Sequence, residues 1–186
     1  KPEEIITLLQ SNDSSFLREV IGLRESFGKD IEDVNDFSHK ISERIFSMTE
    51  TGELVFGEGF LSASIQFMSQ VDAGKHIGAT PDGRSACAPL CDSLAAIFGK
   101  DTDGPTALLN SITSLDLKRA LGVPVVNLNI TQNFNENVLK ALILGYMKQG
   151  GIQLQITYAS MEELLDAYEH PEHHGNLIVR VGGYSE

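Results

Sequence analysis

The sequence of 186 residues has few basic side chains, only two cysteines and no tryptophan. With 14 basic residues against 26 acidic ones, the formal net charge is −12, and a surface of that sign repels nucleic-acid phosphates and anionic membranes. The sequence also lacks a signal-peptide pattern and any apolar run near the ~20 residues that cross a bilayer. We therefore expect neither nucleic acid nor membrane as a partner. Two cysteines are too few for a disulfide framework, so the expected compartment is the reducing cytoplasm.

Helical patterns dominate the first 52 residues. Four apolar residues recur at spacings of three and four within residues 30–46: Val34, Phe37, Ile41 and Ile45. This spacing predicts a helix that packs by that stripe. Shorter stripes predict helices over residues 4–10 and 16–23, and Thr51-Gly52 ends the pattern. We expect residues 1–52 to be a helical segment, followed by one continuous partial domain over residues 53–186.

The second part of the chain alternates strand and helix patterns. We expect strands over 60–71, 125–130, 152–156 and 176–181, and helices over 104–112, 116–121, 136–149 and, after a Ser160–Glu163 capping box, up to about 170. The helix over 136–149 is apolar on most of its circumference, which predicts deep burial. This alternation is typical of an α/β architecture.

Two groups of residues could in principle bind a metal. Cys87 and Cys91 are four residues apart, but no second pair accompanies them, so we interpret them as small buried residues. His170, His173 and His174 lie near Glu172, but Pro171 interrupts the helix face that they would share. We interpret these histidines as a solvated helix end, and His76 as a surface residue. Acidic residues such as Asp33 and Glu43 are expected on solvated helix faces. The sequence therefore predicts no metal site.

The end of the chain carries the most specific pattern, Leu177-Ile178-Val179-Arg180-Val181-Gly182-Gly183-Tyr184. An apolar strand here runs into two glycines and an aromatic residue. Taken alone, this pattern indicates a strand that ends in a loop with positive φ values, where glycine is favoured.

The residues from Arg180 to Ser185 resemble the radical motif of the glycyl radical enzymes, the superfamily of pyruvate formate-lyase and the radical diol dehydratases. Three other stretches agree with this resemblance in the expected order. They are Gly78-Ala79-Thr80-Pro81-Asp82-Gly83-Arg84 with Pro89-Leu90 and Asp92, then Gly104-Pro105-Thr106-Ala107 with Asn110-Ser111, and finally His170-Pro171-Glu172. The stretches at 80–84 and 104–107 resemble the dehydratase and lyase branch more than pyruvate formate-lyase itself.

The resemblance implies a stored radical on Gly183, positioned by Arg180, Val181, Gly182 and Tyr184. It implies an α/β fold in which two parallel five-stranded half-sheets form a barrel surrounded by helices. It also implies an activating enzyme that uses S-adenosylmethionine and a 4Fe-4S cluster to remove the glycine hydrogen, with no cofactor bound directly to this chain. The radical would then pass to a cysteine and cleave a C–C, C–O or C–N bond of a small substrate under anaerobic conditions.

Some parts of such an enzyme are missing from the sequence. The family's catalytic cysteine lies well upstream, and neither Cys87 nor Cys91 has a comparable context, so we expect an excerpt of a longer, homo-oligomeric lyase, dehydratase or formate acetyltransferase-like enzyme that is inactive alone. A first alternative is a repair subunit that docks to a damaged partner enzyme and restores its glycine loop. Matches that extend back to Gly78 argue against it. A second alternative is an inert α/β interaction domain whose glycines only form a turn.

Overall fold

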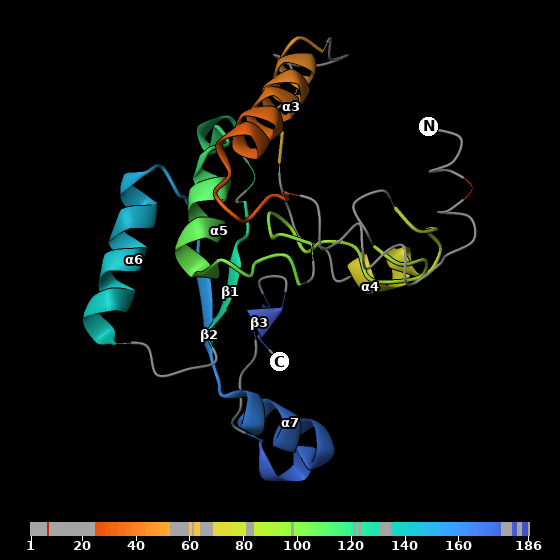
Figure 1. The fold of residues 1–186 in the computed structure, drawn as a ribbon, viewed down its shortest axis with the longest axis vertical. Helices are drawn as coiled ribbons and strands as arrows, with labels where there is room; N and C mark the ends of the chain where they lie inside the picture. The colour runs from red at the N-terminus through yellow and green to blue at the C-terminus, as the bar shows by residue number, and fades with distance from the viewer. Residues whose placement is uncertain are drawn as a thin grey trace.

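The computed structural model describes residues 7, 25–52, 60, 62–63, 69–80, 84–97, 99–120, 122, 124–130, 135–175, 180–181 and 184–185. Within these residues the chain has an α/β fold, as the sequence predicts (Figure 1). The predicted helices over 4–10 and 16–23 lie outside the described residues, apart from Thr7, which is helical. In the described part, no helix combines the length and the apolar character needed to span a membrane.

Helix α3, Glu32–Glu50, is the predicted N-terminal helix, and it ends at Thr51 as expected. Its predicted packing face is wrong. Phe37 is 65% exposed and Ile45 is 53% exposed, so the apolar stripe faces outward. The helix instead docks by a neighbouring face, where Phe46 is buried and His39 Nδ1 lies 2.9 Å from the carbonyl oxygen of Ser114. Polar and aromatic contacts with a distant segment therefore outweigh the simple amphipathic pattern.

Helix α5, Gly104–Thr113, forms the centre of the packed region. Pro105 in its first turn suits a helix start, because the missing N–H would have no helical partner there. Leu108, Leu109 and Ile112 are buried on the face that α5 turns to the sheet. The predicted helix over 116–121 is only the 3₁₀ turn η1, Leu117–Arg119.

Strand β1, Asn127–Ile130, helix α6, Glu136–Lys148, and strand β2, Gln155–Tyr158, form a β-α-β unit. The strands pair in parallel, with Asn127 opposite Gln155 and Ile130 opposite Tyr158. Helix α6 begins at an Asn135 cap, whose side chain accepts a hydrogen bond from the Asn137 N–H. Helices α5 and α6 lie side by side (Figure 1).

The hydrophobic core lies between α5, α6 and one face of the β1–β2 sheet. It contains Ala96, Leu108, Leu109, Ile112, Leu117, Val126, Leu128, Ile130 and Tyr146. The prediction of a deeply buried α6 is wrong, since Tyr146 is its one buried residue and Val138 and Leu144 are more than half exposed. Val138 lines a pocket between α5 and α6 together with Leu109 and Asn110.

The remaining helices lie at the periphery. Helix α7, Met161–Glu169, begins at the predicted Ser160 cap, whose hydroxyl accepts from the Glu163 N–H at 3.0 Å, and is followed by η2, Pro171–His173. Figure 1 places α7 and α3 at opposite ends of the long axis. Helix α4, Gln70–Gly74, replaces the end of the strand predicted over 60–71, although Ala63 forms a parallel bridge with Gly122.

Candidate functional site

The predicted radical motif begins and ends in a short antiparallel pair. Strand β3, Arg180–Val181, pairs with β4, Tyr184–Ser185, so that Val181 lies opposite Tyr184. The two residues that separate these strands in the sequence are Gly182 and Gly183, which lie outside the described residues, as do residues 176–179 of the predicted last strand. Two-residue connections between antiparallel strands need positive φ values, and glycine adopts these without steric cost.

The β3–β4 pair is positioned by the parallel sheet, because β3 lies next to β2. Residues paired in a parallel sheet project from the same face, so the register places Asn127 with Gln155 and Asn129 with Thr157 on one face. The opposite face, which includes Leu128 and Ile156, packs in the core. The predicted radical motif therefore follows a sheet with one apolar face under helices and one polar face.

Asp92 adds a carboxylate to this polar face. Its Oδ2 accepts a hydrogen bond from Asn127 Nδ2 at 2.8 Å. Its Oδ1 and the Oε1 of Gln155 are both shielded from solvent, and neither has a hydrogen-bond partner among the described residues. A shielded oxygen without a donor costs about 1–3 kcal/mol, so these two oxygens are candidate acceptors for an N–H or O–H group.

The loop that resembles the family between Gly78 and Arg84 is organised by the Arg84 side chain. Arg84 is 7% exposed, and its Nη1 donates to the Ala88 carbonyl oxygen at 2.7 Å while its Nη2 donates to that of Gly78. The Thr80 N–H donates to the Arg84 carbonyl oxygen at 3.0 Å, which closes the segment containing the predicted turn at 81–83, itself outside the described residues. Arg84 therefore holds two parts of the loop together through their carbonyl oxygens, a role that its sequence pattern alone does not reveal.

The stretch that resembles the family at the start of α5 also makes long-range contacts. Asn110 Nδ2 donates to Asp30 Oδ2 at 2.7 Å, and the Ser111 hydroxyl accepts from the Asp30 N–H at 3.0 Å. Asp30 has a φ of 57°, a conformation that these two bonds help to hold. The side chains of Asn110 and Ser111 thus anchor the entry into α3.

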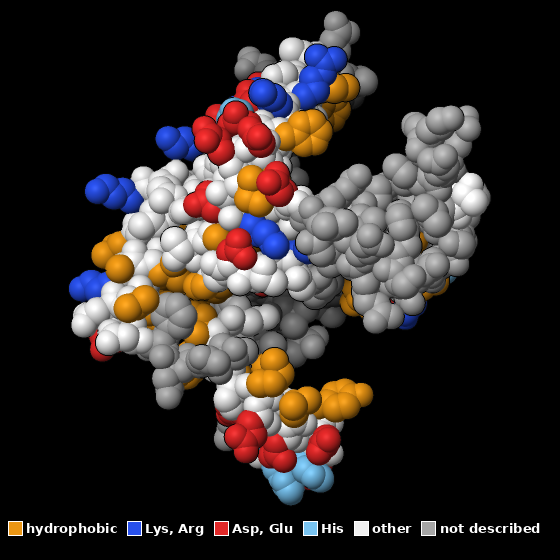
Figure 2. Space-filling model, viewed as in Figure 1, with side chains coloured by type: hydrophobic (Ala, Val, Ile, Leu, Met, Phe, Trp, Pro, Cys, Tyr) orange, Lys and Arg blue, Asp and Glu red, His pale blue; other side chains and the backbone are white. Residues whose placement is uncertain are grey.

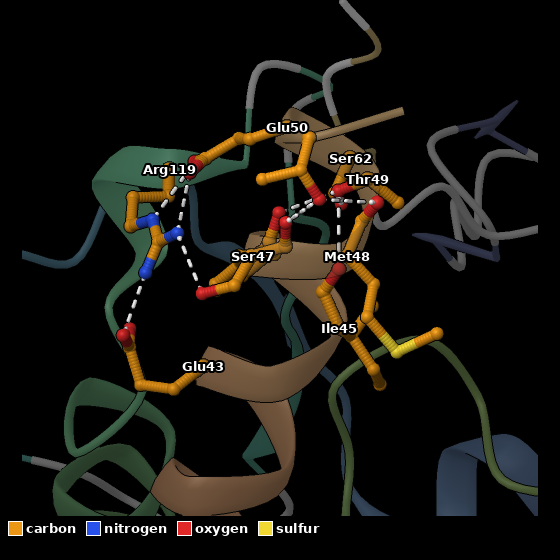
Figure 3. Close-up of polar contacts among 10 residues, drawn as sticks. Glu43, Ile45, Ser47, Met48, Thr49, Glu50, Ser62 and Arg119 are labelled. Atoms are coloured by element: carbon orange, nitrogen blue, oxygen red, sulfur yellow. Dashed lines mark hydrogen bonds and ion pairs between the residues drawn. The ribbon is translucent and has the colours of Figure 1, made fainter. Parts of the chain in front are cut away.

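Arg119, which the sequence analysis missed, fastens α3 to the core (Figure 3). Its guanidinium donates to Glu43 Oε2 and to Glu50 Oε2, both at 2.6 Å, and lies over the Phe46 ring at 5.4 Å. The hydrogen bond from Arg119 lowers the pKa of Glu50, and the two carboxylates raise the pKa of Arg119. Glu43 was expected on a solvated face and is instead an ion-pair partner.

The remaining candidates show no metal-binding geometry. Among the described residues, no group of three or more histidine, cysteine or acidic side chains could hold a metal ion. Cys87 and Cys91 are exposed in irregular structure, so their interpretation as buried residues is wrong. His76 is exposed as expected, and His170 and His173 stack at a solvated helix end with ring centroids 5.5 Å apart.

Comparison with curated proteins gives relatives that are longer than this chain. Indoleacetate decarboxylase of Tractidigestivibacter scatoligenes is 28% identical over 169 residues, which cover 86% of this chain and 19% of the relative. The probable dehydratase YbiW of Escherichia coli strain K12 is 34% identical over 140 residues, which cover 72% of this chain and 16% of the relative. The chain thus spans less than a fifth of the length of these relatives.

Comparison with solved structures identifies the fold. The B12-independent glycerol dehydratase from Clostridium butyricum, in its glycerol-bound form, matches with a TM-score of 0.86 and 29% identity, covering all of this chain and 24% of the dehydratase. A family model described as "Glycine radical" matches residues 92–186, just over half of the chain. These residues include β1, β2 and both strands that flank Gly182 and Gly183. The chain therefore belongs to the glycyl radical enzyme family.

Proposed function

We propose that this chain is the C-terminal part of a glycyl radical enzyme of the dehydratase and lyase branch, and that Gly183 stores the radical. The observation that carries the proposal is the pairing of β3 with β4, the two strands that flank a Gly-Gly dipeptide in the sequence and of which β3 lies next to β2. The family match over residues 92–186 supports the same assignment.

Chemistry explains why a glycine serves at position 183. A radical generated on an activating enzyme would take one hydrogen atom from the α carbon. This C–H bond breaks, the hydrogen forms a bond to the abstracting radical, and one unpaired electron stays on the α carbon. The carbon becomes planar, and the electron delocalises into the amide nitrogen on one side and the carbonyl on the other. A Cβ atom would crowd this plane, which glycine avoids. Gly182 would give the loop the backbone freedom to reach the activating enzyme.

The flanking residues would hold this loop in place. In the proposed enzyme, β1 and β2 contribute two strands to a barrel of parallel half-sheets, with α5 and α6 as outer helices. Arg180, Val181 and Tyr184 would orient the loop from the paired strands on either side of it. The radical would pass to a cysteine outside this chain, and the resulting thiyl radical would break a bond of a small substrate.

The relatives suggest two types of substrate bond that the proposed enzyme would break. A decarboxylase such as indoleacetate decarboxylase breaks a C–C bond of its substrate, whereas a dehydratase such as glycerol dehydratase breaks a C–O bond of its substrate. Because the thiyl cysteine would lie outside these 186 residues, we expect no turnover from this polypeptide alone.

Turnover by the intact enzyme tests the proposal. The enzyme is activated anaerobically and supplied separately with indoleacetate, glycerol and propane-1,2-diol, and products are measured by mass spectrometry. We expect one substrate class to react, and Gly183→Ala to abolish turnover while leaving thermal unfolding unchanged. An enzyme that keeps its turnover after Gly183→Ala would contradict the proposal.

A further inference from the structure

We draw no further inference here: the strongest candidate, the pair of solvent-shielded oxygens Asp92 Oδ1 and Gln155 Oε1 on the polar face of the β1–β2 sheet, carries none, because nothing in the part of the chain that the structure describes shows which donor group would face them.

Discussion

Two parts of the molecule use apolar residues in opposite ways. One is the central region formed by α5, β1, α6 and β2, and the other is the pair of end helices, α3 and α7. In the first region Ile112 is fully buried and Val126 is 1% exposed, and both belong to one continuous core. In α3 and α7, apolar side chains such as Phe37 and Tyr168 lie on the outside. The central region completes its own packing, whereas several apolar side chains of the end helices remain exposed (Figure 2).

This contrast separates the buried residues that hold the sheet together from the exposed apolar residues of α3 and α7. The core fixes the parallel pair β1–β2, and β3 lies beside β2, so the strands around Gly182 and Gly183 depend on it. The attachment of α3 depends on a few polar contacts, chiefly those of Arg119. Substitutions in the core and in α3 should therefore differ in size and in their response to pH.

The largest difference is expected between two isoleucines. Ile112→Ala should lower the free energy of unfolding by about 2–5 kcal/mol, because it removes buried methyl groups and leaves a cavity. Ile45→Ala, at a position 53% exposed, should change it by no more than about 0.5 kcal/mol. Chemical denaturation of the intact protein measures both. Equal losses would show that the α3 stripe is as buried as the core and would remove the contrast.

A smaller and pH-dependent effect is expected for Arg119→Gln, which removes both carboxylate contacts of α3. Arg119 lowers the pKa of Glu50 below its ordinary value of 4.5 in the folded state, so this pair stabilises the fold above that pH and loses its effect as the pH falls further. The difference in melting temperature between wild type and Arg119→Gln should therefore be largest at neutral pH and shrink in acid.

Arg44→Gln is the matched control for Arg119→Gln, since this exposed arginine of α3 makes none of the Arg119 contacts. Its melting temperature should follow that of the wild type at every pH. If the difference in melting temperature between wild type and Arg119→Gln grew as the pH is lowered, it would contradict the assigned role of the Arg119–Glu50 pair.

Local patterns in the sequence predicted most of the element order. The Ser160 cap, the proline in the first turn of α5 and the alternation from residue 125 onward all correspond to observed elements, because caps, turns and periodicity act over a few residues. The packing of α3 and α6 could not be predicted in this way. An amphipathic pattern states that a face is apolar, but it does not state whether the covering partner belongs to the same stretch of chain.

The sequence predicted the radical motif through resemblance and missed several long-range contacts elsewhere in the chain. Asp92 and Asn127 lie 35 residues apart in the sequence. They form their hydrogen bond only because β1 starts beside the segment that contains Asp92. The carbonyl contacts of Arg84 likewise depend on the loop path. Chain folding over long separations produces these arrangements, so a single sequence gave no sign of them.

The most direct test of the central claim is the electron paramagnetic resonance spectrum of the activated intact enzyme with selectively labelled glycine. A radical on the α carbon of Gly183 couples to the one remaining α hydrogen, so the spectrum should be a doublet. That doublet should collapse toward a single line when the enzyme is produced with glycine deuterated at the α carbon, and it should be absent from Gly183→Ala. A signal that survives in Gly183→Ala, or that does not respond to deuterated glycine, would contradict the account.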